Sequence, residues 1–398
     1  MSEDSYTEVT HKSWFSRIGG AFKGIIFGFV LFIAAFPLLF WNEGRAVKTY
    51  KTLKEGSGAV VSVSADKVDP VNEGKLIHLS GKAVTEALLT DPIFGVSSAN
   101  ALKLQRQVEM YQWHESSKSE TKKKLGGGEE TVTTYSYSTN WSNHAISSSS
   151  FKKSAGHENP DSMPYESEEL VADKVTLGAF TLSPSLVSRI SGSQALPVNS
   201  DIPLPKELEG KAKRHAGGFY IGANPVSPQV GDVRITFKTV PAQDISVVAQ
   251  QTGGSFVPYQ ASTGENIELL QAGIVTADAM FKKAQSDNAL FTWILRAVGF
   301  VLMFAGLGMI FKVLSVLADV LPFLGNVVGA GTGIIAFLIA AVLSLITIAV
   351  AWVVYRPLLG IALLAVAVGL IVLVKGKLGA AKQQQAAAMP PSPPPLPA

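Results

Sequence analysis

Four apolar stretches interrupt an otherwise polar chain, one near the N-terminus and three near the C-terminus. They cover residues 24–41, 289–311, 332–355 and 357–374. A helix needs roughly 20 predominantly apolar residues to cross the hydrocarbon core of a bilayer, and each stretch is close to that length. The pattern predicts an α+β membrane protein with four transmembrane helices, one N-terminal and three C-terminal.

The first apolar stretch has a competing interpretation as a cleavable signal peptide. It is long for the apolar region of such a peptide, and no small-x-small cleavage site follows before Asn42. Lys23 precedes the stretch, and Trp41 is suited to the far membrane interface. We interpret residues 24–41 as a retained anchor.

Three charged residues in or beside the C-terminal stretches are candidates for a polar or gating role. Arg296 lies in the first half of its stretch, where its long side chain can reach the interface; the alternative is a buried functional charge. Asp319 and Pro322 interrupt residues 312–331, which we expect to form an interfacial or re-entrant segment. Arg356 and Pro357 predict a tight break before the fourth helix.

Residues 42–288 form one large polar segment in which alternating runs are separated by Gly, Pro, Ser and Asn. This pattern is typical of a β-rich domain. Residues 102–113 and 131–140 predict a long hairpin with a basic, flexible tip at 122–128. The tip is either solvated or in contact with anionic lipid or a partner. Thr276 is a candidate N-cap for a helix that runs into the second apolar stretch.

The lysines after the last apolar stretch predict the orientation. Lys375, Lys377 and Lys382 follow it, whereas Arg356 alone occupies the opposite short turn. Basic residues in short loops mark the cytoplasmic side. We therefore expect cytoplasmic tails at 1–23 and at 375–398, the latter proline-rich, and an extracytoplasmic or lumenal domain at 42–288.

Composition supports a membrane protein and gives little sign of catalysis. Charged residues make up 16% of the chain, against about a quarter in typical soluble domains. The net charge of +3 is too small to indicate nucleic-acid binding, and the absence of cysteine excludes thiolate chemistry. No two of the six histidines have the i, i+4 spacing of a zinc helix. We expect no catalytic, cofactor or metal site, and hence no enzyme.

Three glycines offer a surface for helix association. Gly20, Gly24 and Gly28 recur every fourth residue, on one face of the first predicted helix. Small residues at this spacing let two helices approach closely within lipid. They would pack against the protein's own helices or against a second copy, which would make the chain a homo-oligomer.

Four separated segments resemble the transmembrane protein 43 family, also called LUMA. They are residues 41–46 (WNEGRA), 228–234 (PQVGDVR), 317–322 (LADVLP) and 352–358 (WVVYRPL). The resemblance implies four membrane helices and a lumenal or extracytoplasmic domain. For the animal member it implies the endoplasmic reticulum and inner nuclear membrane, self-association, and contacts with lamins and emerin. Residue usage favours a bacterial member, for which we expect the inner membrane and no lamin contact.

Two functions are compatible with these observations. The first is a non-enzymatic scaffold that self-associates in the lipid bilayer and presents its large domain to protein or lipid partners. The second is a subunit of an ion channel or a transport-accessory protein, in which Arg296, Asp319 and Arg356 line a polar path.

Overall fold

The structure is a computed structural model that describes residues 4–198 and 205–358. It divides into two compact units. The β-rich unit comprises the described part of Met1–Gly20, together with Lys48–Asn288 and Ser315–Val327. The helical unit comprises Ala21–Val47, Ala289–Leu314 and the described part of Val328–Ala398.

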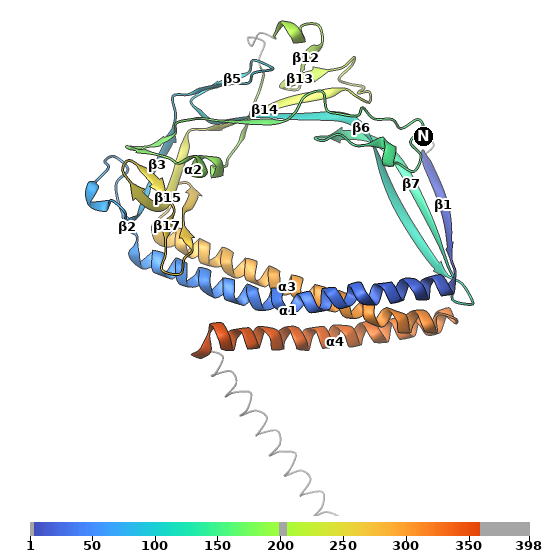
Figure 1. Ribbon diagram of the computed structural model, residues 1–398. Coiled ribbons are helices and arrows are strands. Elements are labelled where there is room, and N and C mark those ends of the chain that lie inside the picture. Colours follow the sequence, from blue (N-terminus) through green and yellow to red (C-terminus); the bar gives the residue numbers. More distant parts are fainter. Residues whose placement is uncertain (1–3, 199–204, 359–398) are drawn as a thin grey trace, which may run out of the picture. The chain divides into compact units, whose positions relative to one another are not determined.

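The β-rich unit contains two larger sheets, antiparallel except for the parallel β2–β3 pair, and two small strand pairs (Figure 1). The first sheet consists of β1 (Ser5–Lys12), β6 (Ala101–Lys123), β7 (Glu129–Ser142), β8 (Glu168–Val171), β11 (Gln194–Leu196), β12 (Ala212–His215), β13 (Gly218–Ile221) and β14 (Val233–Pro241). The second consists of β2 (Val61–Ser62), β3 (Leu76–Val84), β9 (Thr176–Leu177), β10 (Phe180–Thr181), β15 (Gln243–Thr252), β16 (Ser255–Val257) and β19 (Leu269–Ala272). The small pairs are β4 (Leu88–Thr90) with β5 (Ser97–Ala99), and β17 (Tyr259–Gln260) with β18 (Asn266–Ile267).

The predicted long hairpin is confirmed, and both of its strands are longer than expected. β6 and β7 pair in continuous register from Met110 opposite Ser142 to Lys123 opposite Glu129. The first half of β6 is buried, whereas its second half is polar and exposed. The hairpin therefore begins as core sheet and ends as a polar ribbon.

Each larger sheet has its own hydrophobic core. Phe94, Phe219 and Phe237 pack together on the first sheet, and their rings lie in stacked or edge-on contact. On the second sheet, β3 and β15 contribute alternate apolar side chains to a core that also contains the short helix α2 (Pro184–Arg189). The alternation read from the sequence therefore corresponds to burial.

The N-terminal tail is not separate from the domain, in contrast to the predicted division at residues 1–23. Strand β1 adds to the edge of the first sheet and pairs with β7 over eight residues, from Ser5 opposite Ser136 to Lys12 opposite Glu129. Glu8 forms an ion pair of 2.9 Å with Lys152, which raises the pKa of that lysine through the hydrogen bond. This pairing was not predicted because β1 is almost entirely exposed and lacks apolar alternation.

Three long helices contain the first three predicted membrane stretches. They are α1 (Trp14–Ala59), capped by Ser13; α3 (Ala277–Ala318), capped by the predicted residue Thr276; and α4 (Pro322–Tyr355). Residues 42–59 are therefore helical, although they were assigned to the β-rich domain. Residues 312–331, predicted as an interfacial or re-entrant segment, are the end of α3, a tight turn and the start of α4. Pro37 lies within α1.

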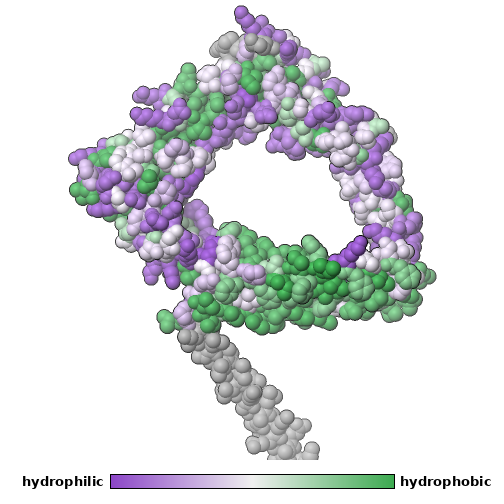
Figure 2. Space-filling view, viewed as in Figure 1, coloured by the Kyte–Doolittle hydropathy of each residue, from purple (hydrophilic) through white to green (hydrophobic). Residues whose placement is uncertain are grey.

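The helical unit combines an apolar interior with an apolar exterior. Ala35, Leu39, Met303, Ala336 and Ala340 form the centre of its packing. Large apolar side chains also cover its outer surface, as the hydrophobic colouring along α1, α3 and α4 in Figure 2 shows. All three helices are long and apolar enough to cross a membrane. Since apolar surface on this scale is unfavourable in water, the chain is an integral membrane protein.

The fourth predicted helix, residues 357–374, and the proline-rich tail at 375–398 lie outside the described residues except for positions 357 and 358. The break predicted at Arg356 and Pro357 agrees with the end of α4 at Tyr355.

Leucine in place of Gly28 should destabilise the helical unit. A Cβ atom at Gly28 would lie 2.7 Å from the carbonyl oxygen of Gly306 and 2.7 Å from Cβ of Met309, so α1 and α3 would have to separate. Overpacking of this kind costs about 1–3 kcal/mol. We expect a lower Tm in detergent for Gly28→Leu. Gly308→Leu is the control, because a Cβ there meets nothing within 4 Å; equal Tm values for the two variants would contradict close packing at Gly28.

Candidate functional site

A buried carboxylate organises the turn between α3 and α4. Asp319 is fully buried and ends α3, and its carboxylate binds both Arg17 of α1 and Lys123 of the β6–β7 hairpin. Lys123 Nζ lies 2.7 Å from one Asp319 oxygen and donates a further hydrogen bond of 2.8 Å to Asn326. Arg17 also pairs with Glu129 at 2.9 Å. We call these five residues the Asp319 cluster.

The backbone fits tightly around the Asp319 cluster. A Cβ atom at Gly325 would overlap the Asp319 carboxylate, so only glycine allows this close approach. The indole of Trp14 donates a hydrogen bond of 2.8 Å to the carbonyl of Val316. The amide of Gly126, at the hairpin tip, donates one of 3.1 Å to Val320. The basic tip predicted to be flexible is therefore docked on the α3–α4 turn.

Charge in the Asp319 cluster is balanced. Two cations, Arg17 and Lys123, face two anions, Asp319 and Glu129, and the side chains of Arg17 and Asp319 are 7% and 1% exposed. An isolated charge at such depth would be strongly disfavoured, and pairing with good hydrogen-bond geometry offsets that cost. The arrangement joins three elements that are far apart in the sequence.

A second buried carboxylate organises the helical unit. Glu43 of α1 is fully buried and accepts two hydrogen bonds from Arg296 of α3, from Nε at 2.6 Å and from Nη2 at 2.9 Å. The indole nitrogen of Trp352 on α4 donates a third at 2.7 Å. The Arg296 guanidinium also lies 4.6 Å from the ring of Trp293. We call these four residues the Glu43 cluster.

Polar contacts continue along α1 beside the Glu43 cluster. The side-chain amide of Asn42, also fully buried, donates to the carbonyl of Thr292 at 3.0 Å. Arg45 donates to the hydroxyl of Thr292 at 3.0 Å and lies 4.7 Å from the ring of Phe291. Asn42, Glu43 and Arg45 of α1 therefore all contact residues of α3.

The predicted polar residues differ in their surroundings. The side chain of Arg296 is held within the helical unit by the fully buried Glu43. Asp319 is a buried partner for two cations. Arg356 is partly exposed, with its guanidinium 5.9 Å from the ring of Trp352. No described contact brings these three residues to one site.

The three predicted packing glycines also separate into two kinds. Gly28 lies directly against Gly306, within the protein's own helices, while a Cβ at Gly20 or Gly24 meets no described atom within 4 Å. Gly28 therefore serves internal packing, and the helix surface around Gly24 is open.

Sequence reasoning missed Glu43, Trp352, Arg17 and Lys123 as site residues. One signal was available for Glu43, because an arginine within an apolar helix requires an acidic partner, and Glu43 directly follows the first apolar stretch. Lys123 could not be distinguished from the neighbouring lysines of the hairpin tip.

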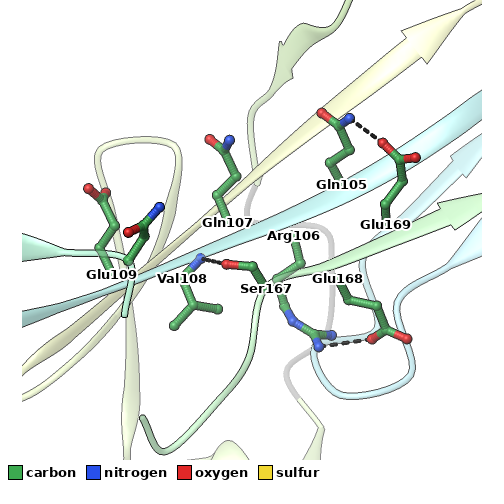
Figure 3. A pocket seen from close by; sticks show the side chains of 9 residues that line it. Gln105, Arg106, Gln107, Val108, Glu109, Ser167, Glu168 and Glu169 are labelled. Atoms are coloured by element: carbon green, nitrogen blue, oxygen red, sulfur yellow. Dashed lines mark hydrogen bonds and ion pairs between the residues drawn. The ribbon is translucent and has the colours of Figure 1, made fainter. Parts of the chain in front are cut away.

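A polar hollow of ≈490 Å³ lies beside β6 in the β-rich unit (Figure 3). Its carboxylates are already paired: Glu168 with Arg106 at 2.9 Å, Glu169 with Gln105 at 2.6 Å, and Glu109 with Arg234 at 2.7 Å. Among the described residues, no group of three His, Cys, Asp or Glu side chains is placed to hold a metal ion.

One further carboxylate, that of Asp232, accepts hydrogen bonds inside the β-rich unit. Asp232, within the segment 228–234, accepts hydrogen bonds from the hydroxyl of Tyr220 and, at 2.8 Å, from the amide of Gln229. Burial and this carboxylate both raise the pKa of Tyr220. Its hydroxyl therefore stays protonated and continues to donate, which fixes the loop before β14.

Removing the charge of Asp319 should release the hairpin tip. In Asp319→Asn, Arg17 and Lys123 lose their buried anion, and Glu129 alone remains to balance them. We expect faster trypsin cleavage at residues 122–124 in detergent-solubilised protein. Glu120→Gln, which removes an exposed partner of Lys118, is the control and should leave cleavage unchanged. Equal cleavage of the wild type and Asp319→Asn would contradict a docked tip.

The Glu43–Arg296 pair should be strongly coupled. Glu43→Gln or Arg296→Met leaves one buried charge unpaired, which typically costs about 3–5 kcal/mol, while the double variant should recover much of that loss. The free energy of unfolding in detergent measures all three variants. Asp287→Asn breaks an exposed pair and should cost less than about 0.5 kcal/mol. Additive losses in the double variant would argue against a direct pair.

Comparison with known proteins agrees with these features. The family model described as Transmembrane protein 43 matches residues 110–357. Transmembrane protein 43 of Mus musculus is 36% identical over 371 residues, which are 90% of this chain and 91% of the relative. The Homo sapiens protein of the same name is 35% identical over 92% of this chain and 93% of its own length.

A more distant relative, Transmembrane protein 43 homolog of Drosophila melanogaster, is 32% identical over 85% of this chain and 90% of its own length. No solved structure matches the chain. The family model covers all members of the two buried clusters except Arg17 and Glu43. This match and the relatives' identity over most of its length show that the chain belongs to the transmembrane protein 43 family.

Proposed function

We propose that this protein is a non-enzymatic membrane scaffold, which self-associates through its helices and presents the β-rich unit to protein or lipid partners. The observation that supports the proposal most directly is the open, apolar surface of α1 around Gly24. Ile26 and Phe27 beside it are 72% and 58% exposed. Helices associate in lipid through small residues that allow close contact.

The rigidity of both units also favours a scaffold. The Asp319 cluster ties the hairpin, α1 and the α3–α4 turn together, and the Glu43 cluster ties α1, α3 and α4 together. Buried, fully paired polar groups tend to specify one arrangement of the elements they join. A protein whose elements are held in one arrangement is suited to position partner proteins.

Exposed charged side chains on the β-rich unit are suited to binding a protein or lipid partner. Lys118 and Glu120 on the hairpin have side chains that are 82% and 63% exposed, and they pair with each other at 3.3 Å. A surface of mixed charge on a long ribbon is compatible with protein partners and with lipid headgroups. We propose that this unit faces away from the cytoplasm, in the endoplasmic reticulum or inner nuclear membrane of a eukaryote or the inner membrane of a bacterium.

The alternative is a channel subunit or transport-accessory protein. It would require Arg296, Asp319 and Arg356 to contribute to a polar path across the membrane. Arg296 and Asp319 are both engaged by buried partners, and that engagement favours the scaffold. Ion flux through proteoliposomes separates the two functions, because a scaffold conducts no more than protein-free vesicles.

Leucine at Gly24 should weaken self-association without unfolding the protein. The side chain would enter open space on the monomer but would prevent close approach by another helix. We expect Gly24→Leu to lower Förster transfer between labelled copies in liposomes by several-fold and to leave Tm unchanged. Gly308→Leu, another glycine with open space around it, is the matched control. A wild-type protein that stays monomeric at every protein-to-lipid ratio would exclude self-association.

A further inference from the structure

Each of the three long helices carries a tryptophan at the end of the helical unit that holds the Glu43 cluster. Trp41 of α1 lies two residues before Glu43 and is 56% exposed. Trp293 of α3 is 65% exposed, and its ring lies 4.6 Å from the guanidinium of Arg296. Trp352 of α4 is partly exposed and donates its hydrogen bond to Glu43. One cluster therefore brings three tryptophans to one level, as in the aromatic belts that mark membrane–water interfaces.

The helices change from uncharged to charged at the same level. The sequence has no charged residue at 24–42 of α1, at 297–311 of α3 or within α4. At 1.5 Å per residue the first two stretches extend roughly 28 Å and 22 Å, which is most of the hydrocarbon thickness of about 30 Å. Beyond them, charge begins at once with Glu43 on α1, Arg296 on α3 and Arg356 after α4. The apolar part of each helix therefore ends where the tryptophans lie.

Positive charge exceeds negative charge at this end of the helical unit. Residues 41–47, 289–297 and 350–358 together contain three arginines, Arg45, Arg296 and Arg356, but one carboxylate, that of Glu43. Arg296 and Glu43 are bound to each other by two hydrogen bonds. The surplus of two positive charges is therefore carried by Arg45 and Arg356.

Arg356 is the arginine of this group that is placed to bind a ligand. It is partly exposed, and its guanidinium lies 5.9 Å from the ring of Trp352. The guanidinium of Arg296 lies 5.6 Å from the same ring. Within residues 4–198 and 205–358, Arg356 has no carboxylate partner, whereas Arg296 has Glu43. A guanidinium is a planar group with five N–H donors, and it can bind a phosphate through two parallel hydrogen bonds.

We infer that this end of the helical unit lies at the membrane–water interface and that Arg356, held against Trp352, binds the phosphate of an anionic phospholipid. Phosphate is the anion that a bilayer provides at the depth of its aromatic belt. The Glu43–Arg296 pair then lies at the edge of the hydrocarbon, where burial of charge costs less than at the centre of the bilayer.

The surplus of positive charge favours a lipid with a net negative headgroup. Phosphatidylcholine also has a phosphate, but its choline carries a compensating positive charge, which Arg45 and Arg356 repel. Phosphatidylglycerol lacks that cation, so the full charge of its phosphate is available to the arginines. The partner of this surface is therefore an anionic phospholipid such as phosphatidylglycerol.

Lipid binding to the full chain in detergent tests the phosphate site. Native mass spectrometry should show that the protein binds phosphatidylglycerol several-fold more tightly than phosphatidylcholine with the same acyl chains. Arg356→Gln should bring the two affinities close to each other, because the neutral amide does not distinguish the headgroups. Its Tm in detergent without added lipid should equal that of the wild type, since Arg356 forms no ion pair with the described residues.

Lys312→Gln is the matched control for Arg356→Gln. Lys312 is an exposed cation at the other end of α3, so its loss removes one positive charge from the same unit but leaves the proposed site intact. This variant should keep the preference for phosphatidylglycerol. Equal affinity of the wild type for the two lipids, or the same preference in Arg356→Gln as in the wild type, would overturn the phosphate site.

The depth of the Glu43 cluster can be measured separately with single cysteines, because the natural chain contains none. Ile294 is adjacent to Trp293, and Val301 lies seven residues later on the same face of α3; they are 49% and 55% exposed. Seven residues correspond to about 10 Å along the helix. In liposomes, a bimane label on Ile294→Cys should be quenched most by lipid spin-labelled at the headgroup, and one on Val301→Cys by lipid spin-labelled in mid-chain. Stronger mid-chain quenching at Ile294→Cys would place the cluster in the hydrocarbon and overturn the inference.

Discussion

Burial of a charged group is unfavourable unless an opposite charge or hydrogen-bond donors meet it, and both clusters follow from that constraint. Glu43 and Asp319 are fully buried carboxylates, and each is bound by side chains from two other elements. Removal of either carboxylate leaves cations in a place where water cannot solvate them. The helices and the hairpin are therefore held together by polar contacts, because lipid provides little hydrophobic drive for helices to associate with one another.

The segments that carry the family resemblance are the segments that supply these clusters. Residues 41–46 contain Asn42 and Glu43, residues 352–358 contain Trp352, and residues 317–322 contain Asp319. Glu43 and Trp352 are more than 300 positions apart, yet they are joined by a hydrogen bond of 2.7 Å. The fourth segment, residues 228–234, contains Asp232, which fixes a loop through Tyr220. The resemblance thus reflects structural demands that several distant positions share, rather than a catalytic apparatus.

Periodicity predicted the helices and the long hairpin, because each depends on a local pattern of apolar positions. Thr276 was recognised as a cap for the same reason. Strand β1 was missed because its residues are almost all exposed, show no apolar alternation and pair with β7 through the backbone. The site partners were missed because sequence distance gives no measure of contact: Lys123 resembles its neighbours Lys122 and Lys124 until the fold brings it to Asp319. Arg296 was noted as a charge within an apolar stretch, but its carboxylate partner in the first helix was not predicted.

The hydropathy of a helix does not describe how the helix is held in the fold. A mean hydropathy of 2.4 for the best window of α1 and of 2.3 for that of α3 records affinity for hydrocarbon, but it does not record direction. Nor does it record which parts of the chain the ends of a helix contact. Strand pairing and the Asp319 carboxylate join residues 4–20 and the α3–α4 turn to the β6–β7 hairpin. The apolar stretches do not predict these contacts, because the contacts depend on polar residues more than a hundred positions apart.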